Sequence, residues 1–292
     1  MSAAEVRAFL GRHGLMARRD LGQNFLCDPA LADKLAARAE IGPTDTVVEI
    51  GTGQGILTRA LAARAARVVT LEVDAGLVRA LGAERSLPEN VELIHADALQ
   101  VDLADLVERA RSAPSPVRVV ANLPYSAASP LLRRLLDLRE SLTSWSVMIQ
   151  KEVARRLVAP VTSRDYGSLT VLHAVSVDVR GGLDLRPGCF YPVPRVVSSF
   201  LHVTPRAGVG LTNRELGELE GLVRAAFSHR RKTLMNSLRE SGRLSHTSPE
   251  VLAILSSHGI GARARAQEVL PETWRALARD LSAARVGGTP CG

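Results

Sequence analysis

The sequence predicts an α/β protein with a largely parallel sheet, followed by a small all-helical C-terminal domain. Two observations lead to this prediction. From Thr46 to Leu138, short apolar segments alternate with segments of helical periodicity, which is typical of strand–helix–strand units. After Thr204-Pro205 and the glycine-containing stretch 207–210, every periodic segment indicates a helix.

The first strand of the predicted sheet ends in a glycine turn. Residues Val47 to Ile50 are mostly apolar, as expected of a parallel strand that is covered on both faces. Gly51, Gly53 and Gly55 follow, and a helix is predicted over 56–66. Glycine has no Cβ, so the backbone can adopt positive φ and a ligand can come close. NAD enzymes, methyltransferases and plain tight turns all use such a turn, so it does not identify the ligand.

Three further strands are predicted to end in polar side chains at the same edge of the sheet. They are 67–74, 91–98 and 117–121, and their ends carry Glu72, Asp97 and Asn122. Open α/β sheets bind ligands at the carboxyl ends of their strands. Glu72 lies about 20 residues past the glycines, where an acid accepts hydrogen bonds from ribose hydroxyls. The turn has no Arg or Lys to neutralise a pyrophosphate, so the two acids favour S-adenosylmethionine (SAM).

The remaining elements follow from the same signals. Asp28 and Pro29 mark the start of a helix that runs to Ala39. Further helices are expected at 75–83, 103–110, 130–138, 151–157, 213–227, from 230 onward, 248–257 and 271–284. Further strands are expected at 144–150, 169–179 and 196–203, with an extended loop at 190–194. We therefore predict domains at 1–205 and 206–286, with a disordered tail at 287–292.

Charge favours a polyanionic partner. The 292 residues include 37 Lys and Arg against 30 Asp and Glu, which gives a net charge of +7. The sequence pI is about 10.0. This balance suits binding to nucleic acid, although an Arg-rich proteome would give the same balance.

Cysteine usage and hydropathy point to an intracellular protein. Cys27, Cys189 and Cys291 are far apart, which argues against a disulfide framework and against a metal site. The N-terminus does not read as a signal peptide, and no apolar run approaches the length of a membrane span. We expect a cytoplasmic protein, and a monomer because nothing suggests an extended dimer surface.

Several motifs together resemble those of a known family. They are Leu21-Gly22-Gln23-Asn24-Phe25-Leu26, Glu49-Ile50-Gly51-Thr52-Gly53, Asn122-Leu123-Pro124-Tyr125, Phe190-Tyr191-Pro192-Val193-Pro194 and Phe227-Ser228-His229-Arg230-Arg231-Lys232. In this order and spacing, they look like those of the ribosomal RNA adenine dimethyltransferases, and among these the bacterial small-subunit (16S) enzymes. The resemblance implies a Rossmann-like, SAM-dependent methyltransferase domain. The sequence departs from the family at Thr52, where Pro is usual, and at Ala127-Ala128, where a polar and then an apolar residue are usual.

The resemblance also implies which residues form the site. The set implied to contact SAM comprises Asn24, Leu26, Gly51, Gly53, Glu72, Asp97, Ala98 and Asn122. Glu72 would accept from both ribose hydroxyls and Asp97 from the adenine amine of the cofactor. Asn24 and Leu26 would close over the methionine end.

The expected reaction is transfer of the SAM methyl group to N6 of an adenosine, twice per base. The side-chain oxygen of Asn122 and the carbonyl of Leu123 would accept the N–H groups of the target amine, so positioning supplies most of the catalysis. Pro124 would stiffen the loop, and Tyr125 and Phe190 would stack on the extruded base. The residues expected to bind RNA are basic, namely Arg155, Arg156, Arg230, Arg231 and Lys232.

Three functions are compatible with these motifs. The first is dimethylation of two adjacent adenosines in the 3′-terminal hairpin of 16S rRNA in the small ribosomal subunit, and the spelling Asn-Leu-Pro-Tyr favours it. The second is modification of 23S rRNA, as in the related macrolide-resistance methylases. The third is a ribosome-assembly factor with little methylation activity, which Ala127-Ala128 alone supports.

Overall fold

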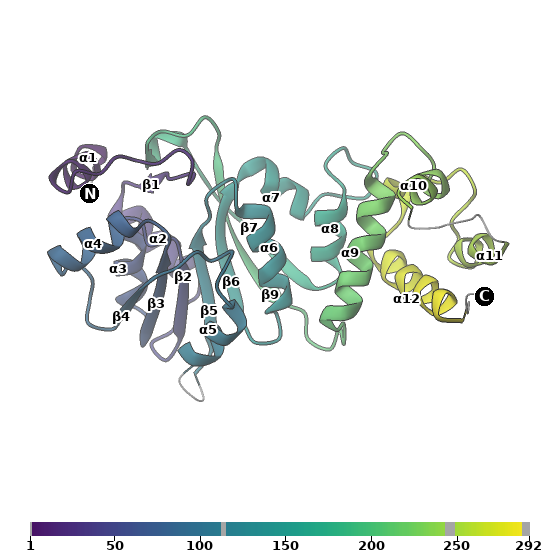
Figure 1. The fold of residues 1–292 in the computed structure, drawn as a ribbon, viewed down its shortest axis with the longest axis horizontal. Coiled ribbons are helices and arrows are strands. Elements are labelled where there is room, and N and C mark those ends of the chain that lie inside the picture. Colours follow the sequence, from purple (N-terminus) through teal and green to yellow (C-terminus); the bar gives the residue numbers. More distant parts are fainter. Residues whose placement is uncertain (1, 112–114, 243–248, 288–292) are drawn as a thin grey trace. The chain divides into compact units, whose positions relative to one another are not determined.

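Seven strands form the central sheet of a computed structural model that describes residues 2–111, 115–242 and 249–287 (Figure 1). In spatial order they are β4 (Val91–His95), β3 (Arg67–Glu72), β2 (Thr46–Ile50), β5 (Val117–Asn122), β6 (Ser144–Gln150), β9 (Ser198–Pro205) and β7 (Val177–Leu185). Strands β4, β3, β2, β5 and β6 pair in parallel, and β9 joins β6 antiparallel. The predicted α/β class and its largely parallel sheet are confirmed.

The parallel register brings the strand ends together. Ile50, the last residue of β2, pairs with Leu71 on one side and with Ala121 on the other. The next residues along the three strands, Gly51, Glu72 and Asn122, therefore lie at the same edge of the sheet.

Helices flank the strands through small and branched apolar side chains. The helices of this part are α1 (Ala3–Arg12), α2 (Pro29–Arg38), α3 (Ile56–Ala62), α4 (Ala75–Glu84), α5 (Leu103–Ala110), α6 (Ala128–Asp137) and α7 (Lys151–Leu157). Leu35 of α2 and Leu61 of α3 are buried in one cluster with Val47 and Val68 of the sheet. Burying a side chain of this size stabilises the fold by roughly 1.5–3 kcal/mol.

The N-terminal helix α1 was not predicted. Ser2 and Glu5 form a capping box at its start. Val6, Phe9 and Leu10 then recur on one face, and they pack against α4. This spacing is the signal of an amphipathic helix, which the basic residues at the end of the segment obscured.

The predicted strand 169–179 is wrong. Residues Ser168–Ala174 form helix α8, and strand β7 begins only at Val177. A short run of branched apolar residues fits either structure, and tertiary packing decides between them. In the structure, Val171, Leu172 and Val175 are buried together, which is the spacing of one helix face.

The described chain divides into two compact units. The first contains residues up to 154 together with 179–205, and the second contains 155–178 together with the described residues from 206 onward. The predicted boundary near residue 205 therefore recurs, but residues 155–178 pack with the C-terminal helices. Tyr166 shows why: its hydroxyl donates to the carbonyl of Val269 at 2.7 Å, and its ring meets that of Phe227 edge-on at 5.8 Å.

The second unit is almost entirely helical. Besides α8 it contains α9 (Asn213–Phe227), α10 (Leu234–Glu240), α11 (Pro249–Ser257) and α12 (Pro271–Gly287). The helix predicted from Arg230 begins at Leu234 instead, because the Thr233 side chain caps it. Ser248, predicted to open α11, and residues 288–292 of the predicted tail lie outside the described residues.

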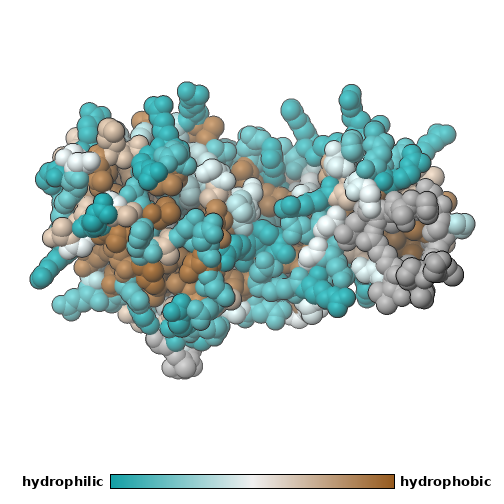
Figure 2. All heavy atoms as spheres, viewed as in Figure 1, coloured by the Kyte–Doolittle hydropathy of each residue, from teal (hydrophilic) through white to brown (hydrophobic). Residues whose placement is uncertain are grey.

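Polar and charged side chains project from most of the face drawn in Figure 2, with apolar patches between them. None of the helices within the described residues is long and apolar enough to cross a membrane.

A carboxyl group lies buried at the centre of the sheet. Glu49 of β2 is fully buried, and its Oε2 accepts from the hydroxyls of Thr58 and Thr70, each at 2.6 Å. Burial raises the pKa of Glu49 to about 8, although both hydroxyls oppose this shift. The hydroxyl of Thr52, which stands where the family usually has Pro, lies 2.7 Å from that of Thr70 and so joins the same buried network.

We predict that Glu49 makes the protein less stable as pH rises from about 4.5 to about 8. Over this window the unfolded chain has lost the proton that the folded chain keeps, so the free energy of unfolding falls with pH. Glu49→Gln carries no such proton. Its free energy of unfolding, measured by urea titration across this window, should rise relative to the wild type by about 1.4 kcal/mol per pH unit. If the free energies of unfolding of the two proteins changed in parallel with pH, Glu49 would not be protonated in the folded protein over this window.

Candidate active site

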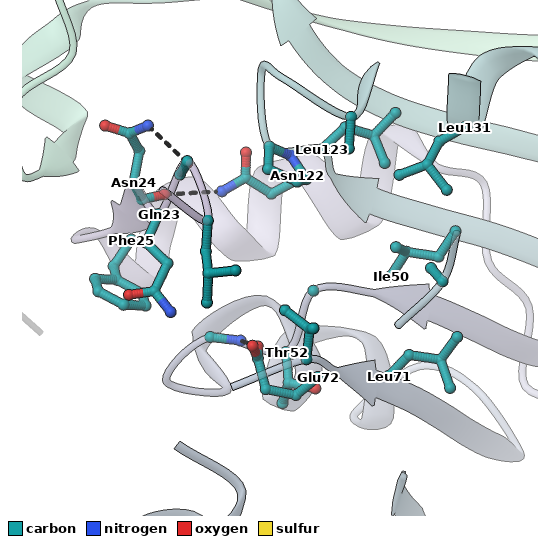
Figure 3. A pocket seen from close by; sticks show the side chains of 18 of the residues that line it. Gln23, Asn24, Phe25, Ile50, Thr52, Leu71, Glu72, Asn122, Leu123 and Leu131 are labelled. Carbon is teal, nitrogen blue, oxygen red and sulfur yellow. Dashed lines mark hydrogen bonds between the residues drawn. The ribbon is translucent and has the colours of Figure 1, made fainter. Parts of the chain in front are cut away.

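A pocket lies at the carboxyl edge of the parallel strands (Figure 3). Its walls come from the segment 21–26, the glycine turn, the ends of β3 and β4, and the segment that follows β5. The predicted site residues that line it are Asn24, Leu26, Gly51, Gly53, Glu72, Asp97, Ala98, Asn122, Leu123, Pro124 and Tyr125. The structure therefore brings into one place residues that are up to a hundred positions apart in the sequence.

The glycine turn forms part of the pocket wall. Gly51 has a φ of +87° and Gly53 has a φ of +57°, values that residues other than glycine rarely adopt. A Cβ at Gly53 would also lie 3.2 Å from the Cδ1 atom of Phe25. A side chain there would strain the backbone and press on the segment that covers the pocket.

Glu72 is a buried acid with a fixed orientation. It is 5% exposed, and its two carboxylate oxygens each accept a backbone N–H, from Gly53 at 2.8 Å and from Asp74 at 3.0 Å. Burial raises the pKa of Glu72, and these two N–H groups oppose the shift. Each oxygen keeps a lone pair, so the carboxylate can accept two further hydrogen bonds from a diol.

Asp97 follows β4 and is oriented by the turn in which it lies. It is half-buried, and its Oδ1 accepts from the backbone N–H of Leu99 at 2.8 Å. The carboxylate can therefore take an N–H or O–H donor from a ligand in the pocket. Ala98 beside it is buried and adds an apolar wall.

The orientation of the Asn122 amide follows from its neighbour. Its Nδ2 donates to the backbone carbonyl of Asn24 at 3.0 Å, and the dashed line in Figure 3 marks this bond. A carbonyl oxygen can only accept, so the amide nitrogen must face it. The Asn122 oxygen is thereby left to accept hydrogen bonds, and no donor to it is described between residues 2 and 287.

Tyr125 is held by a hydrogen bond at the tip of its side chain. Its hydroxyl lies 2.9 Å from the hydroxyl of Ser198, at the start of β9. Burial raises the pKa of Tyr125, and the bond to Ser198 lowers it by less. The half-buried ring is therefore fixed with part of its surface at the pocket.

The structure corrects the prediction for Phe190. This residue is 1% exposed and packs in the core with Leu26 and Phe200, and it does not line the pocket. The reason is the antiparallel pairing of β1 (Phe25–Leu26) with β8 (Phe190–Tyr191), which sets Phe190 opposite Leu26. In this structure the Phe190 ring is therefore not open to a base, and the stacking of a base on Tyr125 stays a prediction.

Gln23 is a site residue for which the sequence suggested no role of its own. Its Nε2 donates to the Asp74 carboxylate at 2.9 Å, and its Oε1 accepts from the Arg18 backbone N–H at 2.8 Å. Gln23 thus fastens the segment that carries Asn24 to the start of α4. Its place beside Asn24 in the first motif was the only available signal.

The five basic residues predicted to bind RNA all belong to the second unit, and they are not equivalent. Arg230 donates to the carbonyl of Tyr166 at 2.9 Å and lies 5.8 Å from the centre of the Phe227 ring. Lys232 forms an ion pair with Glu240. Arg155, Arg156 and Arg231 are exposed, and for Arg155 and Arg231 no ion pair is described within the placed part of the chain.

Comparison of the sequence with known families and proteins identifies close relatives. A family model described as "Ribosomal RNA adenine dimethylase" matches residues 14–281. The "Ribosomal RNA small subunit methyltransferase A" of Geobacter metallireducens is 37% identical over 92% of this chain and 97% of its own length. The protein of the same name from Azorhizobium caulinodans is 40% identical over 97% of this chain and 95% of its own length.

Two solved structures resemble the fold over most of its length. A dimethyladenosine transferase from Plasmodium falciparum superposes with a TM-score of 0.73 at 24% identity, covering 89% of this chain and 98% of its own. The 23S rRNA methyltransferase ErmE superposes with a TM-score of 0.62 at 29% identity, covering 89% of this chain and all of its own. These likenesses confirm the Rossmann-like methyltransferase fold.

We predict that SAM affinity depends on the ionised form of Glu72. Ribose hydroxyls donate best to a carboxylate, so affinity should fall as the pH is lowered through the raised pKa of this side chain. Glu72→Gln should weaken SAM binding by about 10- to 100-fold and flatten the pH dependence, as measured by calorimetry. Glu92→Gln, on exposed β4, is the matched control. A pH profile that persists in Glu72→Gln would assign the titration to another group, of which the neighbouring Glu49 is the first candidate.

Proposed function

Because the chain belongs to the ribosomal RNA adenine dimethylase family, we propose that this pocket carries out the reaction of that family with the residues described above. The protein is a SAM-dependent methyltransferase that dimethylates adenine in ribosomal RNA. The observation that carries the proposed mechanism is the Nδ2 bond of Asn122 to Asn24, which leaves an acceptor oxygen at the mouth of the cofactor site.

The chemistry of the pocket lining supports SAM as the cofactor. Glu72 and Asp97 offer carboxylate acceptors to the ribose hydroxyls and to the adenine amine, and the glycine turn leaves room beside them. Asn24 and Leu26 cover the side where the methionine end would lie. When bound, SAM supplies an electrophilic methyl group on a sulfonium ion.

The chain's own contribution is to hold the target amine. The lone pair of an adenine amine is delocalised into the ring, so the amine is a weak nucleophile. The Asn122 oxygen and the Leu123 carbonyl would accept its two N–H bonds and direct the lone pair toward the methyl group. The backbone N–H of Leu123 donates to the carbonyl of Met148 at 3.1 Å, which ties the residue that carries this carbonyl to the end of β6. No strong base is needed, because positioning and fixed dipoles lower the barrier.

We propose 16S rRNA of the small subunit as the substrate, with two adjacent adenosines in its 3′-terminal hairpin as the target. The similarity supports this choice, because relatives named for the small subunit are 37% and 40% identical, whereas ErmE is 29% identical. The alternative of a weakly active assembly factor rested on Ala127-Ala128. The backbone N–H of Ala127 donates to Pro124 at 2.9 Å, so the turn beside the pocket closes without a polar side chain.

Primer extension across both rRNAs tests the substrate. In a strain that lacks the gene, the stop caused by dimethyladenosine should disappear from 16S rRNA. Loss of a stop in 23S rRNA would support the second alternative, and an assembly defect with both marks retained would support the third. We also propose that the protein acts as a monomer in the cytoplasm, which sedimentation and cell fractionation can test.

We predict that Asn122→Ala lowers kcat by at least about 100-fold, because it removes an acceptor that acts on the reacting amine. SAM should still bind, more weakly. Asn122→Asp should also be impaired, since it sets a second acceptor against the Asn24 carbonyl. Methyl transfer to undermethylated small subunits is the measurement, and Asn236→Ala on α10 is the control. Near-normal turnover of either Asn122 variant would remove this residue from the mechanism.

We predict that Arg155→Ala/Arg231→Ala weakens binding to ribosomal subunits and reduces its dependence on salt. Each lost phosphate contact should lower the slope of log affinity against log salt by about 0.7–0.9. Arg214→Ala, which removes an exposed cation of α9 that pairs with Glu218, is the matched control. Equal affinities for double variant and wild type at all salt concentrations would exclude this pair from the RNA interface.

A further inference from the structure

The loop 192–197, between β8 and β9, exposes apolar side chains. Val193 is 64% exposed and Val196 is 41% exposed. Single exposed apolar residues are common on protein surfaces, so exposure alone is not informative. The position of this loop is what distinguishes it.

Both ends of the loop are attached to residues of the pocket. Before it, Tyr191 pairs with Phe25, which lines the pocket. After it, the Ser198 hydroxyl lies 2.9 Å from that of Tyr125, the residue predicted to stack on the base. In between, the Val197 carbonyl accepts from the backbone N–H of Lys151 at 2.9 Å. The loop is therefore anchored at both ends to residues that line the pocket.

The backbone around Val193 is stiff. Pro192 and Pro194 flank it, so φ is fixed on both sides and Val193 itself is confined to extended conformations. Pro194 is buried while Val193 points into solvent. A side chain presented in this way loses little conformational entropy when it enters a partner.

One arginine belongs to this loop, and another contacts the residue that precedes it. Arg195 is exposed two residues after Val193. The guanidinium of Arg7 lies 5.3 Å from the centre of the Tyr191 ring. No ion pair is described for either arginine within the placed residues, so both can meet phosphates. The loop thus combines a rigid apolar tip with positive charge, which complements a nucleic acid.

The proposed reaction requires the target base to be unstacked, and an apolar side chain can assist this step. The target amine must reach Asn122 inside the pocket, so its base has to leave the RNA stack, which costs stacking free energy. Proteins that unstack bases commonly insert an apolar side chain between base steps.

On the premise of the proposed function, we propose that Val193 enters the RNA stack at the position that the target adenosine leaves, while Arg195 and Arg7 contact the flanking phosphates. Val193 is then a positioning residue, which keeps the base extruded without touching the cofactor.

Truncation of Val193 tests the proposal. Val193→Ala should lower kcat for undermethylated small subunits about tenfold, because the extruded state is less populated. Val193→Leu should stay within about twofold of the wild type. The SAM dissociation constant and the urea midpoint should be unchanged in both variants, since the side chain lies outside the cofactor pocket and the core. Leu270→Ala is the control, because Leu270 is also an exposed apolar residue, at 55%, and lies in the second unit.

A photo-crosslinker locates the contact directly. Val193→p-benzoylphenylalanine, irradiated on the subunit, should crosslink to the nucleotides that flank the target adenosine. Crosslinks to ribosomal protein only, or Val193→Ala turnover within twofold of the wild type, would overturn the proposed insertion of Val193 into the RNA stack. Failure of the wild-type protein to methylate rRNA would instead overturn the proposed function, so the two failures are distinguishable.

Discussion

The bond between Asn122 Nδ2 and the Asn24 carbonyl is the interaction on which the proposed chemistry depends. It joins the end of β5 to a segment almost a hundred residues earlier, and it decides which end of the amide faces the pocket. A free asparagine could present either a donor or an acceptor to the target amine, and a donor would repel its N–H groups. Gln23, through Arg18 and Asp74, holds the segment that supplies the carbonyl. In the proposed mechanism, the segment that lines the pocket around Asn24 therefore also sets the orientation of the Asn122 amide.

Two buried glutamates lie close to the carboxyl edge of the sheet. Glu49 and Glu72 lie on adjacent strands, both are nearly free of solvent, and burial raises the pKa of each. They differ in what surrounds them. Among the described residues, hydroxyl groups donate to the Glu49 carboxyl, which stays within the protein, whereas backbone N–H groups donate to Glu72, which lines the pocket. The environment thus keeps one glutamate inside the sheet and leaves the other, Glu72, at the pocket, where we predict that it accepts from the cofactor.

The second, helical unit contains basic residues in two different environments. Its aromatic residues, Tyr166, Phe227 and Trp274, form a compact core, and Arg230 belongs to that core through the Tyr166 carbonyl and the Phe227 ring. Arg230 of the basic motif therefore stabilises the unit, whereas the exposed Arg231 is available to a polyanion. The charge of the sequence by itself could not separate these two roles.

The sequence by itself determined the five parallel strands of the sheet, the glycine turn and the polar strand ends, because each depends on local hydrophobic periodicity and on the residues that end an element. It also determined α5 and α9 to the residue, where an Asp or Thr cap precedes a clear apolar face. Only the tertiary structure decided the rest. Residues 169–174 are helical because they pack with other helices, and Phe190 is buried because β8 pairs with β1. Neighbours distant in sequence also decide the orientation of the Asn122 amide, which arginines have a partner, and the exposure of Val193. No local sequence pattern carries this information.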